Sequence, residues 1–345
     1  MAENSTTSRG LQRQVLVAGA AGEQIALLGY GACFAAGCLW GTGFYFGRLA
    51  LNEMSVEHMV FYRFLFASLG MMPVVLIHWG RFRLTAREAR LLLICAFFGI
   101  PVQFLIQFHG LARTTVSHAS LMVGSMPVML AAAAAWFAPK GSKEERLDRF
   151  GWLAVCGSTV GAALIVLGGS RGVTARGEPS LAGDLLVLAS LVIALAWILL
   201  SKKLMETHSP PVVTAYTILS GTTMLAAWIM GPLLLNPLLH NKIAPPPIAH
   251  VSLTAWIALA ISGLLCTATT TLLWNWGIHH VPASRAGIFL NLEPAVGSLL
   301  GVKLLGEHLG PYAWTGGGLI LAAAVALTAR GPHPGSALEP AVILE

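Results

Sequence analysis

Residues 183–205 read GDLLVLASLVIALAWILLSKKLM, and this stretch decides the class of fold. No charged residue occurs between Asp184 and Lys202. A helix that crosses the hydrocarbon core of a bilayer needs about 20 mostly apolar residues, and this stretch supplies them. The sequence therefore predicts a membrane-spanning helix here.

The whole chain of 345 residues has the same character. Apolar residues make up 56% of it and charged residues 10%, and the mean hydropathy is +0.72. An ordinary soluble domain carries about 25% charged residues, because its surface must be wetted. The composition excludes a typical soluble enzyme, a disordered chain and a nucleic-acid-binding domain. It predicts an all-α polytopic membrane protein surrounded by lipid.

Ten stretches meet the requirement for a spanning helix, and short gaps between some of them predict tight antiparallel hairpins. The expected spans are 24–50, 56–79, 91–112, 116–138, 150–168, 183–205, 211–234, 251–278, 284–305 and 313–329.

The basic residues predict the orientation. If the N-terminus is cytoplasmic, most of the 21 Lys and Arg residues fall in cytoplasmic segments, with a cluster at 81–90. The opposite side holds fewer, among them Arg48, Arg113 and Lys303. Because Lys and Arg concentrate in cytoplasmic loops, both termini are expected in the cytoplasm. The net charge of +6 then reflects loops that face an anionic leaflet rather than a nucleic acid.

An internal repeat joins the two halves. A constant shift of 167 residues places Gly110 on Gly277 and Pro127 on Pro294, with Ser117 on Ser284 and Ala119 on Ala286 between them. The expected organisation is an N-terminal extension at 1–23, a first five-helix repeat at 24–168, a loop at 169–182, a second repeat at 183–329 and a tail at 330–345. Because five is odd, the second repeat enters the membrane inverted, and such repeats favour a transporter.

Enzyme motifs are missing from the sequence. Only two aspartates occur, Asp148 and Asp184, and neither HExxH nor GxxxxGK[ST] is present. Nucleotide hydrolysis at a P-loop is therefore excluded. We expect no enzyme activity, no cofactor and no metal ion.

Two ionisable residues lie inside expected spans, Arg63 in the second and Glu293 in the ninth. An ionisable side chain in lipid must pair, face a cavity or extend to the interface. The functional interpretation has Arg63 hold a substrate carboxylate and Glu293 hold an amine or a proton. The alternatives are a structural ion pair, support of a helix interrupted by proline, or an Arg63 that extends to the interface.

Polar and small residues mark other helix faces. Gln103 and Gln107 share one face of the third span with Gly110. The fourth and ninth spans carry stripes of small residues that include Pro127 in one and Asn291 and Pro294 in the other. These stripes indicate close helix packing or a cavity wall, and the two prolines are candidate hinges because each removes a backbone hydrogen bond. Trp40, Trp197 and Trp274 lie within spans, where they either line a site or pack in the bundle.

Several of these residues belong to motifs, and on them the chain resembles the drug/metabolite transporter superfamily, in its ten-helix EamA-type branch. The motifs are WGTGF at 40–44, YRF at 62–64, the pattern ending in Pro-Val at 119–128, LEPAV at 292–296 and GEHL at 306–309. The resemblance covers roughly residues 25 to 330. Because Glu293 and Glu307 belong to the family pattern, they are also candidates for determinants of the fold.

The resemblance implies two inverted five-helix repeats around a central cavity. It also implies export of small metabolites across a bacterial inner membrane without ATP, with amino-acid exporters, including the aromatic branch, as the favoured relatives. We expect alternating access around a cavity lined by Trp40, Arg63, Gln103, Gln107, Trp197, Trp274, Asn291 and Glu293. The substrate is expected to be a small amphipathic molecule such as an aromatic or neutral amino acid, and the chain a monomer or weak homodimer. A passive facilitator and an exporter of drugs or nucleosides remain alternatives, and a membrane-embedded enzyme is disfavoured.

Overall fold

The computed structural model describes residues 3–137, 149–168, 179–239, 250–281 and 286–329. The regular elements of these residues are helices, as expected. The expected tail at 330–345, most of the loop at 169–182, and Ser284 of the sequence repeat lie outside the described residues.

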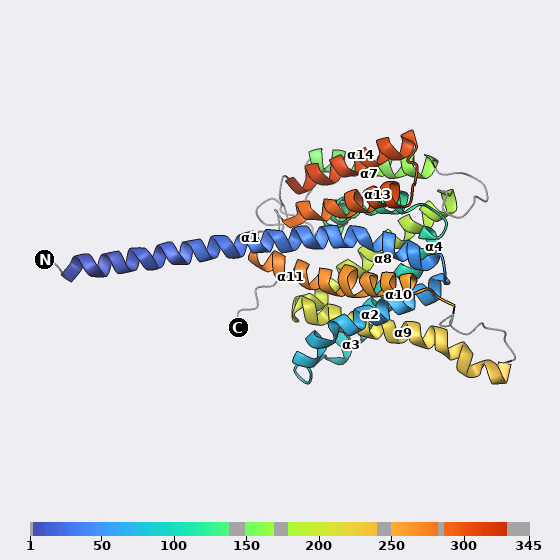
Figure 1. Cartoon of the computed structure of the whole chain (residues 1–345), viewed down its shortest axis with the longest axis horizontal. Helices are drawn as coiled ribbons and strands as arrows, with labels where there is room; N and C mark the ends of the chain where they lie inside the picture. The colour runs from blue at the N-terminus through green and yellow to red at the C-terminus, as the bar shows by residue number, and fades with distance from the viewer. Residues whose placement is uncertain (1–2, 138–148, 169–178, 240–249, 282–285, 330–345) are drawn as a thin grey trace.

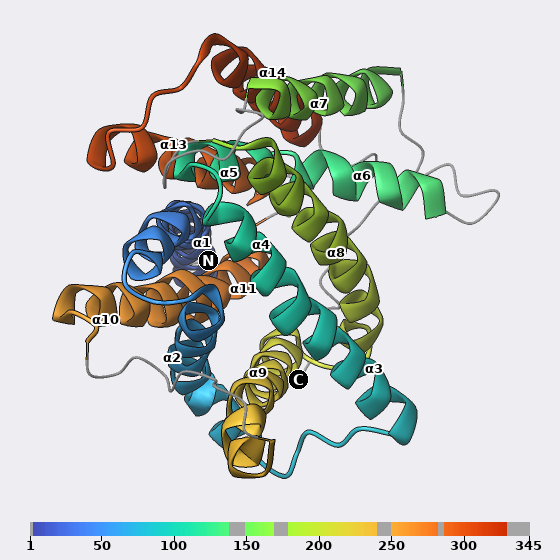
Figure 2. The same cartoon turned by 90° about the vertical axis from the view of Figure 1, so that its right-hand side faces the viewer.

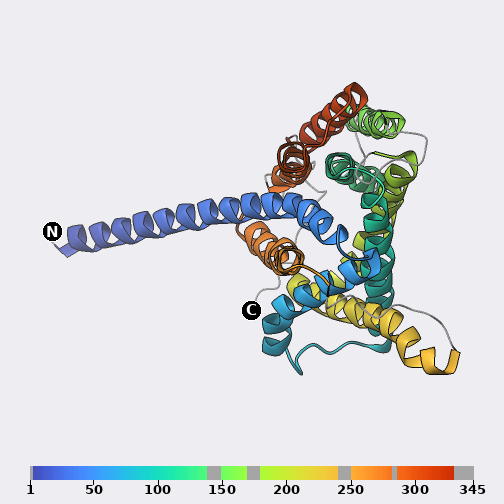
Figure 3. The same cartoon turned by 45° about the vertical axis from the view of Figure 1, so that its right-hand side comes forward.

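Helices occupy all ten expected spans (Figure 1). In chain order they are α1 (Glu3–Leu51), α2 (Val56–Ile77), α3 (Ala86–Phe97), the π-helix η1 (Phe98–Val102), α4 (Gln103–Leu111), α5 (Val116–Val123), α6 (Met126–Phe137), α7 (Arg149–Gly168), α8 (Leu181–Met205), α9 (Pro210–Leu239), α10 (Leu253–Ala260), the π-helix η2 (Ile261–Thr269), α11 (Thr270–His280), the 3₁₀-helix η3 (Gly287–Asn291), α13 (Leu292–Leu304) and α14 (Pro311–Ala329). Helix α1 starts well before the expected span, and its first part projects from the bundle (Figures 1 and 3).

Within the described part of the chain, eight helical stretches are long and apolar enough to cross a bilayer. They include 24–51, 181–205 and 253–280, while α14 holds a shorter apolar stretch at Pro311–Ala326. Large apolar side chains such as Leu69, Trp136 and Trp228 are exposed on the outside of the bundle. A soluble monomer rarely exposes apolar surface on this scale, so these side chains form the face that contacts lipid. The chain is a multi-pass membrane protein.

Four spans are interrupted, and only the interruptions of the fourth and ninth spans, next to Pro127 and Pro294, were expected from the sequence. The third and eighth spans each contain a π-helical segment, η1 with Pro101 inside it and η2. Proline lacks the N–H of the regular helix, which accounts for the irregular ladder around Pro101. The fourth span breaks between Val123 and Met126, and the ninth passes through η3 before α13 begins at Leu292. Single-turn π segments occur in helices often at functional sites.

The repeat of the sequence is visible in the packing. A Cβ on Gly110 of α4 would lie 2.8 Å from Val187 and 2.9 Å from the carbonyl oxygen of Gly183, both in α8. At the matching position, a Cβ on Gly277 of α11 would lie 2.5 Å from Cys33 Sγ in α1. The third span of each half therefore packs closely against the first span of the other half.

Other contacts join equivalent helices of the two halves directly. Ser68 of α2 and Thr222 of α9 share a hydrogen bond of 2.9 Å between their hydroxyl oxygens. Gly161 of α7 and Gly316 of α14 approach each other's carbonyl oxygens, at 2.6 Å and 2.4 Å from an added Cβ. Figure 2 shows α7 beside α14, and α5 beside α13. Contacts between equivalent elements are those that a two-fold relation between the halves produces.

Glu307, in the segment after α13, secures the start of α5. Its Oε1 accepts a hydrogen bond from Val116 N at 2.7 Å, and its Oε2 accepts bonds from Ser117 N at 2.8 Å and Ser117 Oγ at 2.6 Å. The N-cap Thr115 accepts a further bond from His118 N. A carboxylate at a helix N-terminus satisfies free N–H groups and complements the helix dipole. Glu307 thus stabilises the contact between the halves, which agrees with its expected role in the fold.

A second buried hydrogen-bond network connects the start of α5 to α8. Thr114 Oγ1 donates a hydrogen bond to Asp184 Oδ1 in α8, and His118 Nδ1 lies 3.3 Å from Asp184 Oδ2. The side chains of His118 and Asp184 are 3% and 0% exposed. The connection between α4 and α5 is therefore fixed to α8 as well as to the segment after α13.

Candidate functional site

Arg63 of α2 lies in the interior of the bundle. Its side chain is buried, and one guanidinium nitrogen donates a hydrogen bond of 3.3 Å to Thr267 Oγ1 in η2. Its guanidinium carbon lies 5.2 Å from the ring centroid of Phe108, 5.4 Å from that of Phe104 and 6.0 Å from that of Phe64. Aromatic faces at these distances attract a cation.

Part of the hydrogen-bonding capacity of Arg63 is unused. Its Nε has no acceptor within the described residues, and no ion pair within 4.0 Å is found for its guanidinium there. Buried charges in membrane proteins are rare and normally face a partner or a polar cavity. The position of Arg63 therefore fits the binding of an anion better than an extension to the interface.

Glu293 follows η3 in the first turn of α13 and is half-buried. A Cβ on Gly41 of α1 would lie 2.6 Å from the Glu293 carbonyl oxygen, so α1 and α13 meet here backbone to backbone. Glu293 and Arg63 interact electrostatically, although they form no ion pair within 4.0 Å in the described part of the chain. Asn291, in the turn before, is buried. The structural ion pair that the sequence left open is thus not formed in this conformation.

Helix α1 contacts both sides of this region through the 40–43 motif. The Trp40 ring packs against Trp274 of α11, with ring centroids 5.4 Å apart. Thr42 Oγ1 lies 3.1 Å from Cys266 Sγ in η2. A Cβ on Gly43 would stand 3.6 Å from a guanidinium nitrogen of Arg63. One motif of α1 therefore contacts the surroundings of Arg63, Glu293 and Trp274.

Gln103, Gln107 and Trp197 form a second group, at the contact between α4, η1 and α8. Both glutamines are buried, and neither Gln103 Oε1 nor Trp197 Nε1 has a hydrogen-bond partner in the described residues. The Trp197 ring covers Gly99, where an added Cβ would be 2.7 Å from the indole nitrogen. Buried polar atoms without partners cost free energy, and substrate-binding sites are where such atoms are expected.

Each predicted hinge proline follows an interruption of its helix. Pro127 lies in the first turn of α6, after the break at 124–125, and Pro294 lies in the first turn of α13, after η3. The two prolines are near α5 together with Gly124, whose added Cβ would be 3.1 Å from Pro294 Cγ. The interruptions are present where expected, and the hinge motion stays a prediction.

Sequence reasoning missed three residues around Arg63. Phe104 and Phe108 come directly after the predicted Gln103 and Gln107, and Thr267 is the hydrogen-bond acceptor in η2. The spacing of four residues between the phenylalanines repeats that of the glutamines, so it was a usable signal. Nothing in the sequence distinguishes Thr267 from the hydroxyl residues beside it.

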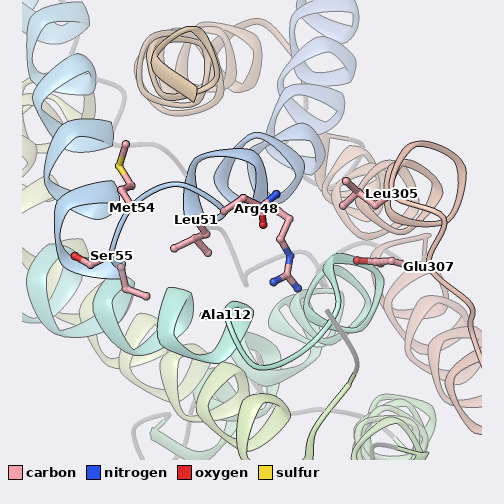
Figure 4. A pocket seen from close by; sticks show the side chains of 9 residues that line it. Arg48, Leu51, Met54, Ser55, Ala112, Leu305 and Glu307 are labelled. Atoms are coloured by element: carbon pink, nitrogen blue, oxygen red, sulfur yellow. The ribbon is translucent and has the colours of Figure 1, made fainter. Parts of the chain in front are cut away.

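The structure also contains a cavity of about 320 Å³ at the end of the bundle where α1 finishes (Figure 4). Arg48, Ser55 and Glu307 are among the side chains that line it, and none of the eight predicted binding residues does. This cavity is therefore separate from the predicted site.

Comparison with known protein families decides the identity of the chain. The model of the EamA-like transporter family matches residues 27–167 and again residues 181–329. The chain belongs to the EamA-like transporter family. The two matches cover both halves, so the expected repeat is a duplication of the EamA unit. Because this is a family of transporters, the expectation that the chain is not an enzyme is confirmed.

Individual relatives of this EamA-like transporter agree with the family match. An uncharacterized transporter of Archaeoglobus fulgidus is 25% identical over 296 residues, which are 86% of this chain and 95% of that protein. A "Probable terminal-alkyne amino-acid exporter" of Streptantibioticus cattleyicolor is 25% identical over 294 residues, which are 84% of this chain and 90% of that protein. A protein of known crystal structure superposes on 90% of this chain and 99% of its own with a TM-score of 0.55 and 17% identity, a likeness of fold.

Proposed function

We propose that this EamA-like transporter exports small amphipathic metabolites, most specifically aromatic or neutral amino acids, across a bacterial inner membrane without ATP. The observation that carries the proposal is Arg63, a buried cation with an unused donor and no acidic partner within 4.0 Å in the described residues. A guanidinium binds a carboxylate through parallel hydrogen bonds, which makes the carboxylate of an amino acid a fitting ligand.

The surroundings of Arg63 support a ligand with an aromatic or apolar side chain. Phe104 and Phe108 lie beside the guanidinium, and the Trp40–Trp274 pair is reached along the same face of α1. Ligand sites are usually apolar with a few well-placed polar groups. In this proposal Glu293, which interacts electrostatically with Arg63, binds the amine of the ligand or a coupling proton.

The remaining predicted residues would complete the site from both halves. Gln103, Gln107 and Asn291 are buried amides on helices next to the interruptions of the third and ninth spans. Trp197 has an indole N–H without a partner in the described residues. Substrate sites between repeats lie near the middle of the membrane and next to broken helices, which supports this assignment.

The proposed mechanism is alternating access, in which one half of the bundle rocks against the other around this site. The interruptions before Pro127 and Pro294 lie in the equivalent fourth and ninth spans, which pack against each other through α5 and α13, and are the proposed hinges. We propose that both termini are cytoplasmic, so that the end of α1 at Leu51 faces outward. The name of the Streptantibioticus cattleyicolor relative, an amino-acid exporter, supports the substrate class.

Counterflow in liposomes tests the substrate class. The purified full-length chain is reconstituted, loaded inside with unlabelled L-phenylalanine, and exposed outside to a trace of labelled L-phenylalanine. We expect accumulation of label that unlabelled L-tryptophan inhibits, while phenethylamine, which lacks the carboxylate, inhibits at least tenfold less well. Failure of every amino acid to exchange in folded protein would refute the proposal and direct the search to nucleosides and drugs.

A proton gradient separates a coupled carrier from a passive facilitator. We expect an inwardly acidic or alkaline gradient to change the steady level of labelled L-phenylalanine in wild-type liposomes, and Glu293→Gln to remove this response while exchange continues. Glu206→Gln, at an exposed carboxylate beyond α8, is the matched control. An unchanged response in Glu293→Gln would remove Glu293 from the coupling role.

A further inference from the structure

The cavity at the end of α1 is built around a buried cation. Arg48, in the last turn of α1, is 8% exposed and lines the cavity. The basic-residue count places Arg48 on the side opposite the cytoplasm, and the structure adds that its guanidinium is enclosed by the ends of α1, α4 and α13 and the start of α2. Figure 4 shows the side chains of Arg48 and Glu307 extending toward each other from opposite walls.

Most donors of Arg48 are unoccupied. One guanidinium nitrogen donates a hydrogen bond to the carbonyl oxygen of Thr114, and no other acceptor and no ion pair are found for this guanidinium within the described residues. A guanidinium has five N–H donors in a planar fork. A buried cation with this much unused capacity is a site for an anion with two oxygens.

The charged side chains in the lining are the cation Arg48 and the carboxylate of Glu307, which attract each other electrostatically. Glu307 is the acidic residue in its lining, and its carboxylate already accepts three hydrogen bonds from Val116 and Ser117 at the start of α5. Helix α2 begins at Val56 in the lining of the cavity, so its positive end faces this region, whereas the start of α5 is already neutralised by Glu307. Each helix N-terminus carries about half an elementary charge. Glu57, the nearby acid in the first turn of α2, is paired with His109 at 3.2 Å.

The remaining wall is apolar. Leu51, Met54, Val56 and Leu305 contribute to the lining, and the volume of about 320 Å³ lies at the small end of the range for ligand pockets. A free inorganic anion would leave this apolar surface uncovered. A small carboxylate that carries an apolar group matches both parts of the wall.

We propose that this cavity is a second binding site, in which Arg48 holds the carboxylate of a small amphipathic solute at the end of the transport path. The site is distinct from the one around Arg63, because the two arginines lie on different helices and line different surroundings. Identification of the occupant as a transported solute rests on the proposed function. Binding of a carboxylate at Arg48 does not.

Equilibrium binding to the purified full-length chain tests the site without transport. The probe is labelled 3-phenylpropionate, which has a carboxylate and no amine, and 3-phenylpropanamide is the uncharged comparison. Arg63→Gln protein is used so that the carboxylate site proposed there is removed. We expect this protein to bind the carboxylate at least tenfold more tightly than the amide, with one site per chain.

Two added substitutions in the Arg63→Gln protein locate that site. Arg48→Gln should weaken carboxylate binding about tenfold or more and leave amide binding unchanged. Leu305→Trp, which fills the cavity and keeps Arg48, should weaken binding of both compounds. Arg113→Gln is the matched control, because Arg113 is exposed at the same end of the bundle and its side chain donates a hydrogen bond to the His109 carbonyl oxygen of α4.

Gel filtration and thermal melting establish that each variant is folded. If Arg63→Gln does not fold, the wild-type chain is used, and the proposal then expects two carboxylate sites per chain that fall to one in Arg48→Gln. Carboxylate binding that neither Arg48→Gln nor Leu305→Trp changes would overturn the second site. Absent counterflow with this binding intact would count only against the proposed function.

Discussion

Glu307 provides the sharpest test of how the two halves hold together. Its carboxylate accepts three hydrogen bonds, of 2.6 to 2.8 Å, from the first turn of α5. Hydrogen bonds to a charged group contribute about 1.5–3 kcal/mol each, and water in the adjoining cavity can replace part of them. We therefore expect Glu307→Ala to lower the free energy of unfolding by about 3 kcal/mol, the sum reduced for that replacement.

Glu307→Gln should have a smaller effect. The amide keeps one oxygen acceptor but turns an NH₂ group toward an N–H donor of α5, so a loss of about 1–2 kcal/mol is expected. Gly301→Ala perturbs the same contact from α13, because its Cβ would lie 2.4 Å from both Glu307 Oε2 and Ser117 Oγ. It should therefore destabilise the protein as well.

The free energy of unfolding is measured by titrating sodium dodecyl sulfate into dodecylmaltoside micelles and following tryptophan fluorescence. The control Glu206→Gln, at an exposed carboxylate, should stay within about 0.5 kcal/mol of wild type. A Glu307→Ala protein that also stays within this range, or that is no less stable than Glu307→Gln, would refute the capping argument.

Three further predictions concern single contacts. Gly41→Ala should reduce stability and transport, because its Cβ would lie 2.6 Å from the Glu293 carbonyl oxygen. Gly31→Ala in the same helix would have no neighbour within 4 Å and should melt like wild type. Equal melting temperatures of the two variants in detergent would contradict this prediction. Asp184→Ala should lower the free energy of unfolding by about 3–5 kcal/mol in the same titration, because Thr114 and His118 lose their buried acceptor. Asp184→Asn should lower it less. The reverse order of the two variants would contradict the assignment. The hydroxyl and backbone N–H of Ser252 donate hydrogen bonds of 2.6 Å to the Glu53 carboxylate and lower the pKa of Glu53. This contact stabilises the fold above the ordinary pKa of a glutamate, about 4.3, and its contribution is lost as the pH falls through the lowered pKa. Glu53→Gln should therefore melt below wild type near pH 7 and like wild type in strong acid, and a melting difference that persists in acid would be the contrary result.

The sequence was sufficient for the spans and the duplication because both depend on local composition. Long apolar runs fix where helices cross the membrane, and the shift that joins Gly110 to Gly277 identifies positions where backbones must approach closely. The start of α3 at Ala86, five residues before the expected span, reflects a different signal. Thr85 and Glu88 form a capping box, and polar capping residues do not register in a search for apolar runs.

The remaining features depend on contacts between distant segments. Arg48 carries the same charge as the loop arginines, and its burial depends on residues far away in sequence, at the ends of α4 and α13. The Glu307 contact spans about 190 residues of sequence to reach Ser117. The π-helical segment η2 contains no proline, so the residues within it give no sequence signal for its irregular form. For the site, Arg63 and Glu293 could be selected because charge is rare in spans, whereas Thr267 could not be selected among its polar neighbours.

The central claim is that Arg63 binds the carboxylate of a transported amino acid. Counterflow of labelled L-phenylalanine in liposomes tests it most directly, with wild type, Arg63→Gln, Arg63→Lys and the exposed control Arg113→Gln compared at equal amounts of folded protein. The account predicts accumulation by wild type and Arg113→Gln, a loss of at least tenfold in Arg63→Gln, and partial activity in Arg63→Lys, which keeps the charge but not the planar fork. Counterflow in Arg63→Gln equal to that of wild type would contradict it.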